Sequence, residues 1–548
     1  MQSSAPLSSD LGELPVPNRT IGWLLTLAGV IALVFLCVNS WGERLQDDAY
    51  ISFVYSRNFA QGHGFVYFPM VKPTDFPVEG YSNFLWTALF GLVMKGGVDD
   101  PGHIAQVLGT VFGCLCVVLT YLISRRLGAS PLLGGIAAVL IAFEPTLTEE
   151  ALGGLETTFY ATLILAALLL YLRRPRTKRH GLVGSGLLGV AALTRPETPF
   201  FFGMLELREL FLAIKEGRSF GTWIKESAPR WLPFLILVLG HLAWRVGFYG
   251  EWLPNTYYAK TTHSALAWNN GVDYVLQGIG YSGVFLFLLP FWMLRRMEQG
   301  GAFLTILAAL FALYVLQAGG DFKLSFRYLM VPILLWGALG AAAVESLGRT
   351  LHEHDPRIKR WLAPVLLAVM GTTHLINEHL YKETNTFQAQ RHQHLKAAGE
   401  LLDQQLPIDA TIAVSNAGRI PFFSGRRTID MLGLNDHHIA RQPVKALAAE
   451  ALVGHERGDG KYVLGLKPDV ILFVNTCILP QRLGDMPGHR SILQREAFST
   501  SEKELVSNYQ MFNAYHLKSA KLPGVNMTGP DGTEFPVYLN WWQRVSQQ

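Results

Sequence analysis

Residues 21–65 read IGWLLTLAGVIALVFLCVNSWGERLQDDAYISFVYSRNFAQGHGF. The run Ile21–Val38 is apolar and long enough to enter a lipid bilayer. Two adjacent carboxylates, Asp47 and Asp48, follow shortly after it. Neighbouring carboxylates repel each other, and a nearby low dielectric disfavours their charge, so one pKa of such a pair is raised. We therefore expect this pair to take part in chemistry at the membrane–water boundary.

From the residues alone, two roles for the pair stay open. One is structural, with the carboxylates capping a helix and stabilising its dipole at the membrane surface. The other is catalytic, with one carboxylate as general base or nucleophile and the other positioning it or binding a metal. A raised pKa suits a base that works near neutral pH.

The composition indicates a membrane protein. Of the 548 residues, 50% are hydrophobic and only 16% are charged, whereas soluble proteins carry about 25% charged residues. The deficit is concentrated before Leu380. A formal net charge of +4 is too small to indicate a nucleic-acid partner. The four cysteines show no disulfide or zinc spacing, and the first apolar run is interpreted as a retained signal anchor.

Apolar runs recur through the first two thirds of the chain, separated by short polar loops. Flanking small residues extend most of the shorter runs toward the length that crosses a bilayer. We predict a mostly α-helical, polytopic membrane protein with about eleven transmembrane helices. The runs are Ile21–Val38, Ile104–Ile123, Leu132–Phe143, Phe159–Leu172, Leu182–Leu193, Phe200–Leu212, Trp231–Phe248, Tyr281–Leu294, Phe303–Ala318, Leu329–Leu347 and Leu362–Leu375.

Lysine and arginine concentrate in alternate loops, such as those at 125–126 and 173–179. Loops rich in these residues face the cytoplasm, so an odd number of spans places the N-terminus inside and the C-terminus outside. The apolar stretch Tyr81–Met94 would break this alternation as a span, and we predict a helix lying along the outer membrane surface. The predicted parts are a cytoplasmic tail at 1–20, a transmembrane domain at 21–378 with a large first outer loop at 39–102, and an extracytoplasmic α/β domain at 379–548.

The outer α/β domain is predicted from a change in pattern. Beyond Asn377 the chain is polar, with a helical pattern at Gln388–Gln404. Strand-like runs at Thr411–Val414 and Val470–Val474 are bounded by turn residues.

Polar residues that could serve a reaction gather on the predicted outer side. Arg195 lies in the turn TRPE and Arg327 enters the next span from outside. Ionisable groups at membrane depth are expensive, and they are presumed functional. Arginine binds phosphate bidentately, although an ion pair that fixes helices or a snorkelling arginine gives the same pattern. The other candidates for donor binding are Glu79, Asn255, Tyr258 and Lys260.

Seven strings occur in an order that resembles a known family. They are QDDAYISFVYSRNFAQGHGFVY, VEGYSNFLW, GGLETTFYA, TRPET, GEWLPNTYYAK, GGDF and SNAGRIPFFSGRRTIDMLGLND, and they span residues 46–436. The chain resembles the GT-C superfamily of membrane glycosyltransferases, whose first outer loop carries an acidic motif. Within it, the chain is most similar to the mycobacterial-type terminal β-(1→2) arabinofuranosyltransferase family.

The resemblance implies a reaction and a set of residues. The donor would be an arabinofuranose on a polyprenyl phosphate, the acceptor a cell-envelope glycan, and the place the outer face of a bacterial cytoplasmic membrane. Asp47 and Asp48 match the catalytic motif, and Asp48 can also hold a divalent metal, which the residues allow without requiring. The outer domain would cap the cavity and contact the acceptor through Asn416, Arg419, Asp430, Asn435 and Asp436.

Other functions stay open at this point. A GT-C enzyme can use another lipid-linked sugar, such as mannose, or a protein or pilin acceptor. A transporter of lipid-linked sugars is a different class, but transporters often carry two related halves, and the chain has no such internal repeat.

Overall fold

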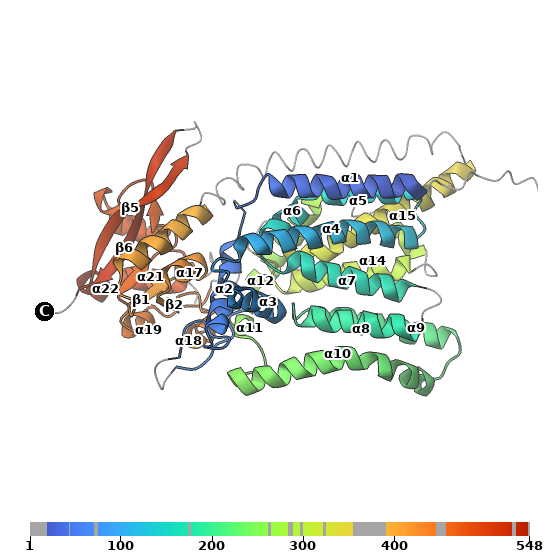
Figure 1. Cartoon of the computed structure of the whole chain (residues 1–548), viewed down its shortest axis with the longest axis horizontal. Coiled ribbons are helices and arrows are strands. Elements are labelled where there is room, and N and C mark those ends of the chain that lie inside the picture. The colour runs from blue at the N-terminus through green and yellow to red at the C-terminus, as the bar shows by residue number, and fades with distance from the viewer. Residues whose placement is uncertain are drawn as a thin grey trace, which may run out of the picture.

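A computed structural model of the chain has two parts, a helical bundle and a C-terminal domain built on a β-sheet (Figure 1). The structure describes residues 19–42, 44–70, 75–173, 177–260, 265–282, 289–295, 300–321, 325–354, 391–444, 456–528 and 533–545. The predicted run Leu362–Leu375 and the start of the predicted outer domain lie outside these residues.

Apolar sequence forms the helices of the bundle. Each predicted run from Ile104 to Leu212 falls on a helix, because backbone polar groups in an apolar setting need internal hydrogen bonds. The bundle helices are α1 (Arg19–Val38), α4 (Gly102–Arg126), α5 (Pro131–Ala142), α6 (Pro145–Leu152), α7 (Thr157–Leu172), α8 (Lys178–Ala192), α9 (Thr198–Lys215), α10 (Phe220–Tyr249), α12 (Ala265–Ser282), α14 (Gly301–Gln317) and α15 (Met330–His354).

Some of these helices are long enough to cross a membrane. Four of the described helical segments, namely α1, α4, α10 and the segment Arg327–Thr350, are long and apolar enough to cross a membrane. The pair α5 and α6 makes a fifth if it counts as one span bent by 52°. Several other apolar helices are shorter. The count of about eleven spans stays a prediction.

One predicted run differs from the structure. Tyr281–Leu294 was expected as a single span. Its residues 283–288 lie outside the described residues, and Leu289–Arg295 at its end forms a short 3-10 helix, η1. Pro290 lies in η1 and has no N–H to donate to a helical hydrogen bond. Its carbonyl instead accepts a hydrogen bond from the Thr305 hydroxyl of α14, with 2.9 Å between the oxygens.

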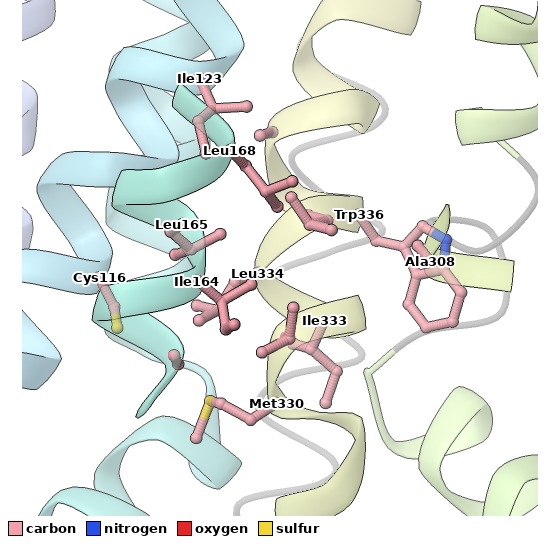
Figure 2. Packing of buried hydrophobic residues seen from close by; sticks show 14 of the residues in the cluster. Cys116, Ile123, Ile164, Leu165, Leu168, Ala308, Met330, Ile333, Leu334 and Trp336 are labelled. Atoms are coloured by element: carbon pink, nitrogen blue, oxygen red, sulfur yellow. The ribbon is translucent and has the colours of Figure 1, made fainter. Parts of the chain in front are cut away.

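The core of the bundle lies between α7 and α15. Ile164 and Leu168 of α7 face Ile333 and Leu334 of α15 (Figure 2), and all four side chains are almost completely buried. The helices α4 and α6 approach each other closely at Gly109, because a Cβ on this residue would lie 2.1 Å from the Ala151 carbonyl oxygen of α6. Small residues at such crossings give helices the dispersion contacts that hold membrane bundles together.

Two shorter helices, α2 (Asp47–Ala60) and α3 (Phe84–Lys95), lie where the bundle meets the sheet domain (Figure 1). They pack on each other, with Phe59 of α2 against Gly91 of α3. The helix predicted at Tyr81–Met94 therefore exists, shifted by a few residues. Tyr50, Phe53 and Phe90 form a buried aromatic cluster at this junction. The segment between α1 and α4, predicted to be the first outer loop, is thus a packed platform on which the C-terminal domain rests.

The C-terminal domain, called the cap below, contains a six-stranded sheet with the order β2-β1-β3-β6-β4, and β5 pairs with β6. The strand β1 pairs in parallel with β2 and β3, whereas β6 runs antiparallel to its neighbours. The strands are β1 (Thr411–Val414), β2 (Arg427–Asp430), β3 (Val470–Leu472), β4 (Ile478–Leu479), β5 (Tyr515–Thr528) and β6 (Glu534–Arg544).

The sequence located part of this domain. The strand at Thr411–Val414 is confirmed, and the run Val470–Val474 contains β3. Residues 391–405 form a helix where a helical pattern was expected. The long pair β5 and β6 was not predicted, although Val537, Leu539 and Trp541 alternate as buried residues along β6. The remaining cap helices are short: α17 (Arg419–Ser424), α18 (His437–Ala440), α19 (Gly460–Gly465), α20 (His489–Glu496), α21 (Thr500–Ser507) and α22 (Tyr509–Ala514).

Candidate active site

The two adjacent aspartates occupy the first turn of α2. Carboxylates are favourable there because the helix N-terminus carries a partial positive charge. Consecutive residues on a helix point in directions about 100° apart, so Asp47 and Asp48 face different neighbours. This separation gives the two carboxylates different environments.

Asp47 faces the cap. Its Oδ1 accepts a hydrogen bond from the backbone N–H of Arg419, at 2.8 Å, and its Oδ2 accepts one from Gly418, at 3.2 Å. Burial raises the pKa of Asp47, the N–H of Arg419 lowers it, and the Asp48 charge raises it further. Both carboxylate oxygens of Asp47 are therefore engaged in holding the cap.

Asp48 faces the bundle. Its Oδ2 lies 3.5 Å from Nη1 of Arg327, and its side chain is 29% exposed. The Arg327 side chain is only 7% exposed and is paired with Asp321 through Nε and Oδ2 at 2.5 Å. A buried arginine between two carboxylates keeps its charge and presents a fixed donor set.

The backbone before Arg327 adopts an uncommon conformation. Phe326 has φ of 51°, in the left-handed region that bulky residues rarely occupy. Its ring is buried against Tyr274 and Tyr281. Strained backbone persists only where the surroundings impose it, and it is concentrated at functional sites. Here it directs Arg327, in the 3-10 helix η2 (Arg327–Leu329) ahead of α15, toward the aspartates.

A second buried arginine lies in the turn between α8 and α9. Arg195 is paired with Glu156 at 3.2 Å and with Glu197 at 2.9 Å. Its guanidinium also lies 4.9 Å from the ring centroid of Tyr328. The amide of Asn83, just before α3, donates to Glu156 at 2.7 Å. The structural alternative for Arg195, an ion pair, is thus present, and through Glu156 and Asn83 it ties the turn to the segment before α3.

The two arginines line one pocket. The pocket is narrow, and the roughly 240 Å³ of space among its lining residues includes open solvent. Its polar side has two guanidinium groups beside one carboxylate, and its other side is apolar and aromatic. The lining residues are Tyr160, Arg195, Glu197, Phe311, Arg327, Tyr328, Met330 and Val331. An anionic group with an apolar or sugar-like neighbour matches this combination.

Four of the predicted donor-binding residues lie outside this pocket lining. Glu79 is buried and holds both Nε and Nη2 of Arg245, at 2.6 and 3.1 Å. Burial raises the pKa of Glu79, and Arg245 opposes that rise. Asn255 donates to the carbonyls of Gly433 and Leu434 in the cap. These contacts fasten the outer loops to one another and to the cap.

The other two predicted donor-binding residues, Tyr258 and Lys260, lie in α11 (Asn255–Lys260). The Tyr258 hydroxyl lies 3.4 Å from Glu251, and the Arg441 guanidinium lies 4.1 Å from the Tyr258 ring centroid. Lys260 ends α11 and is half-buried, with no ion pair to any residue that the structure describes.

Most of the residues expected to contact an acceptor are instead buried and hydrogen-bonded to other parts of the chain. Arg419, Asp430 and Asn435 are at most 4% exposed. Asp430 accepts hydrogen bonds from the backbone of Leu432 and Asn435, and burial raises its pKa to about 6. Asn435 also meets the Tyr55 hydroxyl of α2 at 3.0 Å. These residues build the joint between cap and bundle.

The last two predicted acceptor residues are more accessible. Asp436 is half-buried, caps α18 by accepting from the N–H of Ile439, and accepts from the Tyr462 hydroxyl. Asn416 is half-buried and follows β1 in the loop that approaches α2.

Several residues of the site were missed by sequence reasoning. Tyr160 and Tyr328 line the pocket beside the arginines, and Arg57 donates from α2 to the Phe422 carbonyl of the cap at 2.5 Å. For Tyr328, the one signal in the sequence is that this aromatic residue directly follows Arg327. The others carry no local pattern that separates them from ordinary belt or surface residues.

A metal at Asp48 is not supported by the surrounding side chains. Among the residues that the structure describes, no group of three or more His, Cys, Asp or Glu is arranged to hold a metal ion. Arg327 instead supplies the positive charge nearest to Asp48. We derive no step through a metal.

Two solved structures have a similar fold. ArnT from Cupriavidus metallidurans bound to undecaprenyl phosphate matches with a TM-score of 0.50 and 13% identity, over 75% of this chain and 86% of that one. The archaeal oligosaccharyltransferase AglB from Archaeoglobus fulgidus, in complex with an inhibitory peptide and a dolichol-phosphate, matches with a TM-score of 0.52 and 11% identity, over 94% and 74%. The chain therefore shares its fold with ArnT and with this oligosaccharyltransferase.

Sequence comparison adds a more particular similarity. The terminal beta-(1->2)-arabinofuranosyltransferase of Corynebacterium glutamicum is 28% identical over 373 residues, which is 60% of this chain. The match spans about half of that relative's length, 52%. Residues 382–538 match a family described as a domain of unknown function, DUF8728.

Proposed function

We propose that the protein is a glycosyltransferase that moves arabinofuranose from a polyprenyl phosphate to a hydroxyl of a cell-envelope glycan. The observation that carries the proposal is the position of Asp48 beside Arg327, at a pocket that Arg195 also lines. The 28% identical relative, named as an arabinofuranosyltransferase, supports the choice of sugar. The ArnT structure with undecaprenyl phosphate supports a lipid-linked donor.

The pocket fits the phosphate of such a donor. Arg195 and Arg327 are both buried, and their planar donors match phosphate oxygens bidentately. A low-dielectric setting strengthens this attraction. Phe311, Met330 and Val331 give the apolar side a surface for the first isoprene units, and Tyr328 offers a ring edge to a sugar.

The reaction joins an acceptor oxygen to the anomeric carbon and breaks the bond from that carbon to the phosphate oxygen. Asp48 is the carboxylate of the pair that lies beside Arg327, which lines the pocket, so we assign to Asp48 the step at the acceptor hydroxyl or the anomeric carbon. The electron pair of the broken bond stays on the polyprenyl phosphate, whose charge Arg327 and Arg195 stabilise.

The proposed orientation places the cap outside the cytoplasm. Arg125 and Arg126 end α4, Arg173 follows α7, and Lys178 and Arg179 begin α8, all at the end of the bundle away from α2 (Figure 1). Such basic clusters mark the cytoplasmic side. The domain limits 1–20, 21–378 and 379–548 belong to the same proposal. A reporter enzyme that works only outside the cytoplasm, fused after Gln548, should be active. Activity of a cytoplasm-only reporter at the same position would contradict this orientation.

The decisive experiment supplies the purified protein with a panel of polyprenyl-phosphate sugars and a glycan acceptor. We expect release of polyprenyl phosphate and growth of the acceptor with the arabinofuranosyl donor. Release only from a mannosyl donor, or growth only of a peptide acceptor, would move the proposal to another GT-C reaction. Transport of intact donor across a vesicle membrane without cleavage would replace the enzyme by a transporter.

A further inference from the structure

Asp47 makes a contact between α2 and the cap that the catalytic proposal does not use. Its two carboxylate oxygens hold the backbone N–H groups of Gly418 and Arg419, at the start of α17. A charged acceptor with two N–H donors forms strong hydrogen bonds, and leaving either partner unpaired when buried is costly. This contact joins residues 371 and 372 positions apart in the sequence.

The fit at this contact leaves no free space. A Cβ on Gly418 would lie 1.9 Å from the backbone oxygen of Asp47. A second tight fit occurs at Gly80 of the outer loop, where a Cβ would lie 1.9 Å from Oδ1 of Asn435 in the cap. The cap thus approaches the outer loop at backbone distance in two places.

Further bonds converge on the same cap segment. The Arg419 guanidinium donates to the Leu45 carbonyl at 2.9 Å and lies 4.6 Å from the Tyr50 ring centroid. The Tyr67 hydroxyl donates to the Ala417 carbonyl at 2.5 Å. The segment 417–422 is therefore bound from several sides by the first outer loop.

We propose that Asp47 is a positioning residue that fixes the cap against α2 and so sets where an acceptor meets the pocket. The proposal rests on the proposed glycosyltransferase function. Asp48 follows Asp47 directly in the first turn of α2, so a displacement of Asp47 by the cap moves Asp48 as well. The two aspartates then divide the work: Asp48 acts at the reaction centre, and Asp47 transmits the position of the cap to it.

Kinetics of Asp47→Asn test this division. An asparagine has one acceptor oxygen, and its NH₂ group would face an N–H donor. We expect kcat/KM for the glycan acceptor to fall about 10- to 100-fold, with the KM for the donor unchanged. Hydrolysis of the donor by water, scored as polyprenyl phosphate released without acceptor, should persist. Gly418→Ala should give the same pattern, and the double variant should be no worse than either single one because both break one contact.

The matched control is Asp409→Asn, which makes the same substitution at an exposed position of the cap and should behave as the wild type. Hydrogen exchange of residues 411–424 in the full chain provides a readout that needs no substrate, and exchange should be faster in Asp47→Asn and Gly418→Ala. Loss of donor hydrolysis in Asp47→Asn with unchanged exchange would overturn the proposal, because Asp47 would then act in the chemistry itself. If the wild type cleaves no donor, the glycosyltransferase proposal fails while the exchange result still decides whether Asp47 holds the cap.

Discussion

Asp48→Asn should lower the rate of sugar transfer by about 10²- to 10⁴-fold, the contribution typical of a positioned acid–base group. The amide has nearly the same shape as the carboxylate, but it neither accepts a proton near neutral pH nor attacks carbon. Arg327 keeps Asp321 as a partner in this variant, so the pocket should remain folded. The measurement is the initial rate of polyprenyl phosphate release, with and without acceptor.

Asp99→Asn is the matched control for Asp48→Asn. Asp99 is an exposed carboxylate in the same outer loop, and its substitution should leave the rate near the wild-type value. Both transfer and hydrolysis should fall in Asp48→Asn, in contrast to the pattern expected for Asp47→Asn. Nearly full transfer by Asp48→Asn would remove Asp48 from the reaction centre.

Arg327→Met should destabilise the protein and abolish use of the donor. The substitution leaves Asp321, whose side chain is 5% exposed, without its arginine, and loss of one partner from a buried ion pair costs about 3–5 kcal/mol. It also removes one of the two guanidinium groups at the pocket. We expect a lower midpoint of thermal unfolding together with the loss of polyprenyl phosphate release.

The double variant Asp321→Asn/Arg327→Met separates these two effects. With Asp321 neutral, the buried charge left by Arg327→Met is gone, so much of the stability should return. Donor cleavage should stay absent, because the phosphate still lacks its guanidinium partner. Recovery of cleavage along with stability would show that Arg327 serves only the fold.

The bundle was largely predictable because each helix carries its own signal. Runs such as Ile104–Ile123 are apolar throughout and have the length of a helix in an apolar medium. The end of Tyr281–Leu294 is a 3-10 helix where an α-helix was expected, and apolar composition alone does not register that Pro290 lacks the N–H that regular α-helical bonding needs. Long-range pairing explains the missed β5 and β6, since a strand of mixed composition is stabilised mainly by its neighbour.

The candidate site was predicted in its parts but not in its grouping. Arg195 and Arg327 stood out because charge at membrane depth is costly, and the structure brings both to one pocket. Glu79 and Asn255 were candidates because they lie in outer-loop motifs, yet they bind Arg245 and the cap backbone. A buried ionisable group in a structural ion pair and one in a substrate site look the same in a sequence, because both need a partner of opposite charge.

The sequence by itself determined that this chain forms a bundle of apolar helices followed by a sheet domain, and that two adjacent carboxylates follow the first apolar run. These properties depend on local composition and spacing, which act over one or two helical turns. Only the tertiary structure decided that Asp47 meets Gly418 while Asp48 meets Arg327. Helix geometry sends the two side chains in different directions, but what lies in each direction is brought there by segments hundreds of residues away.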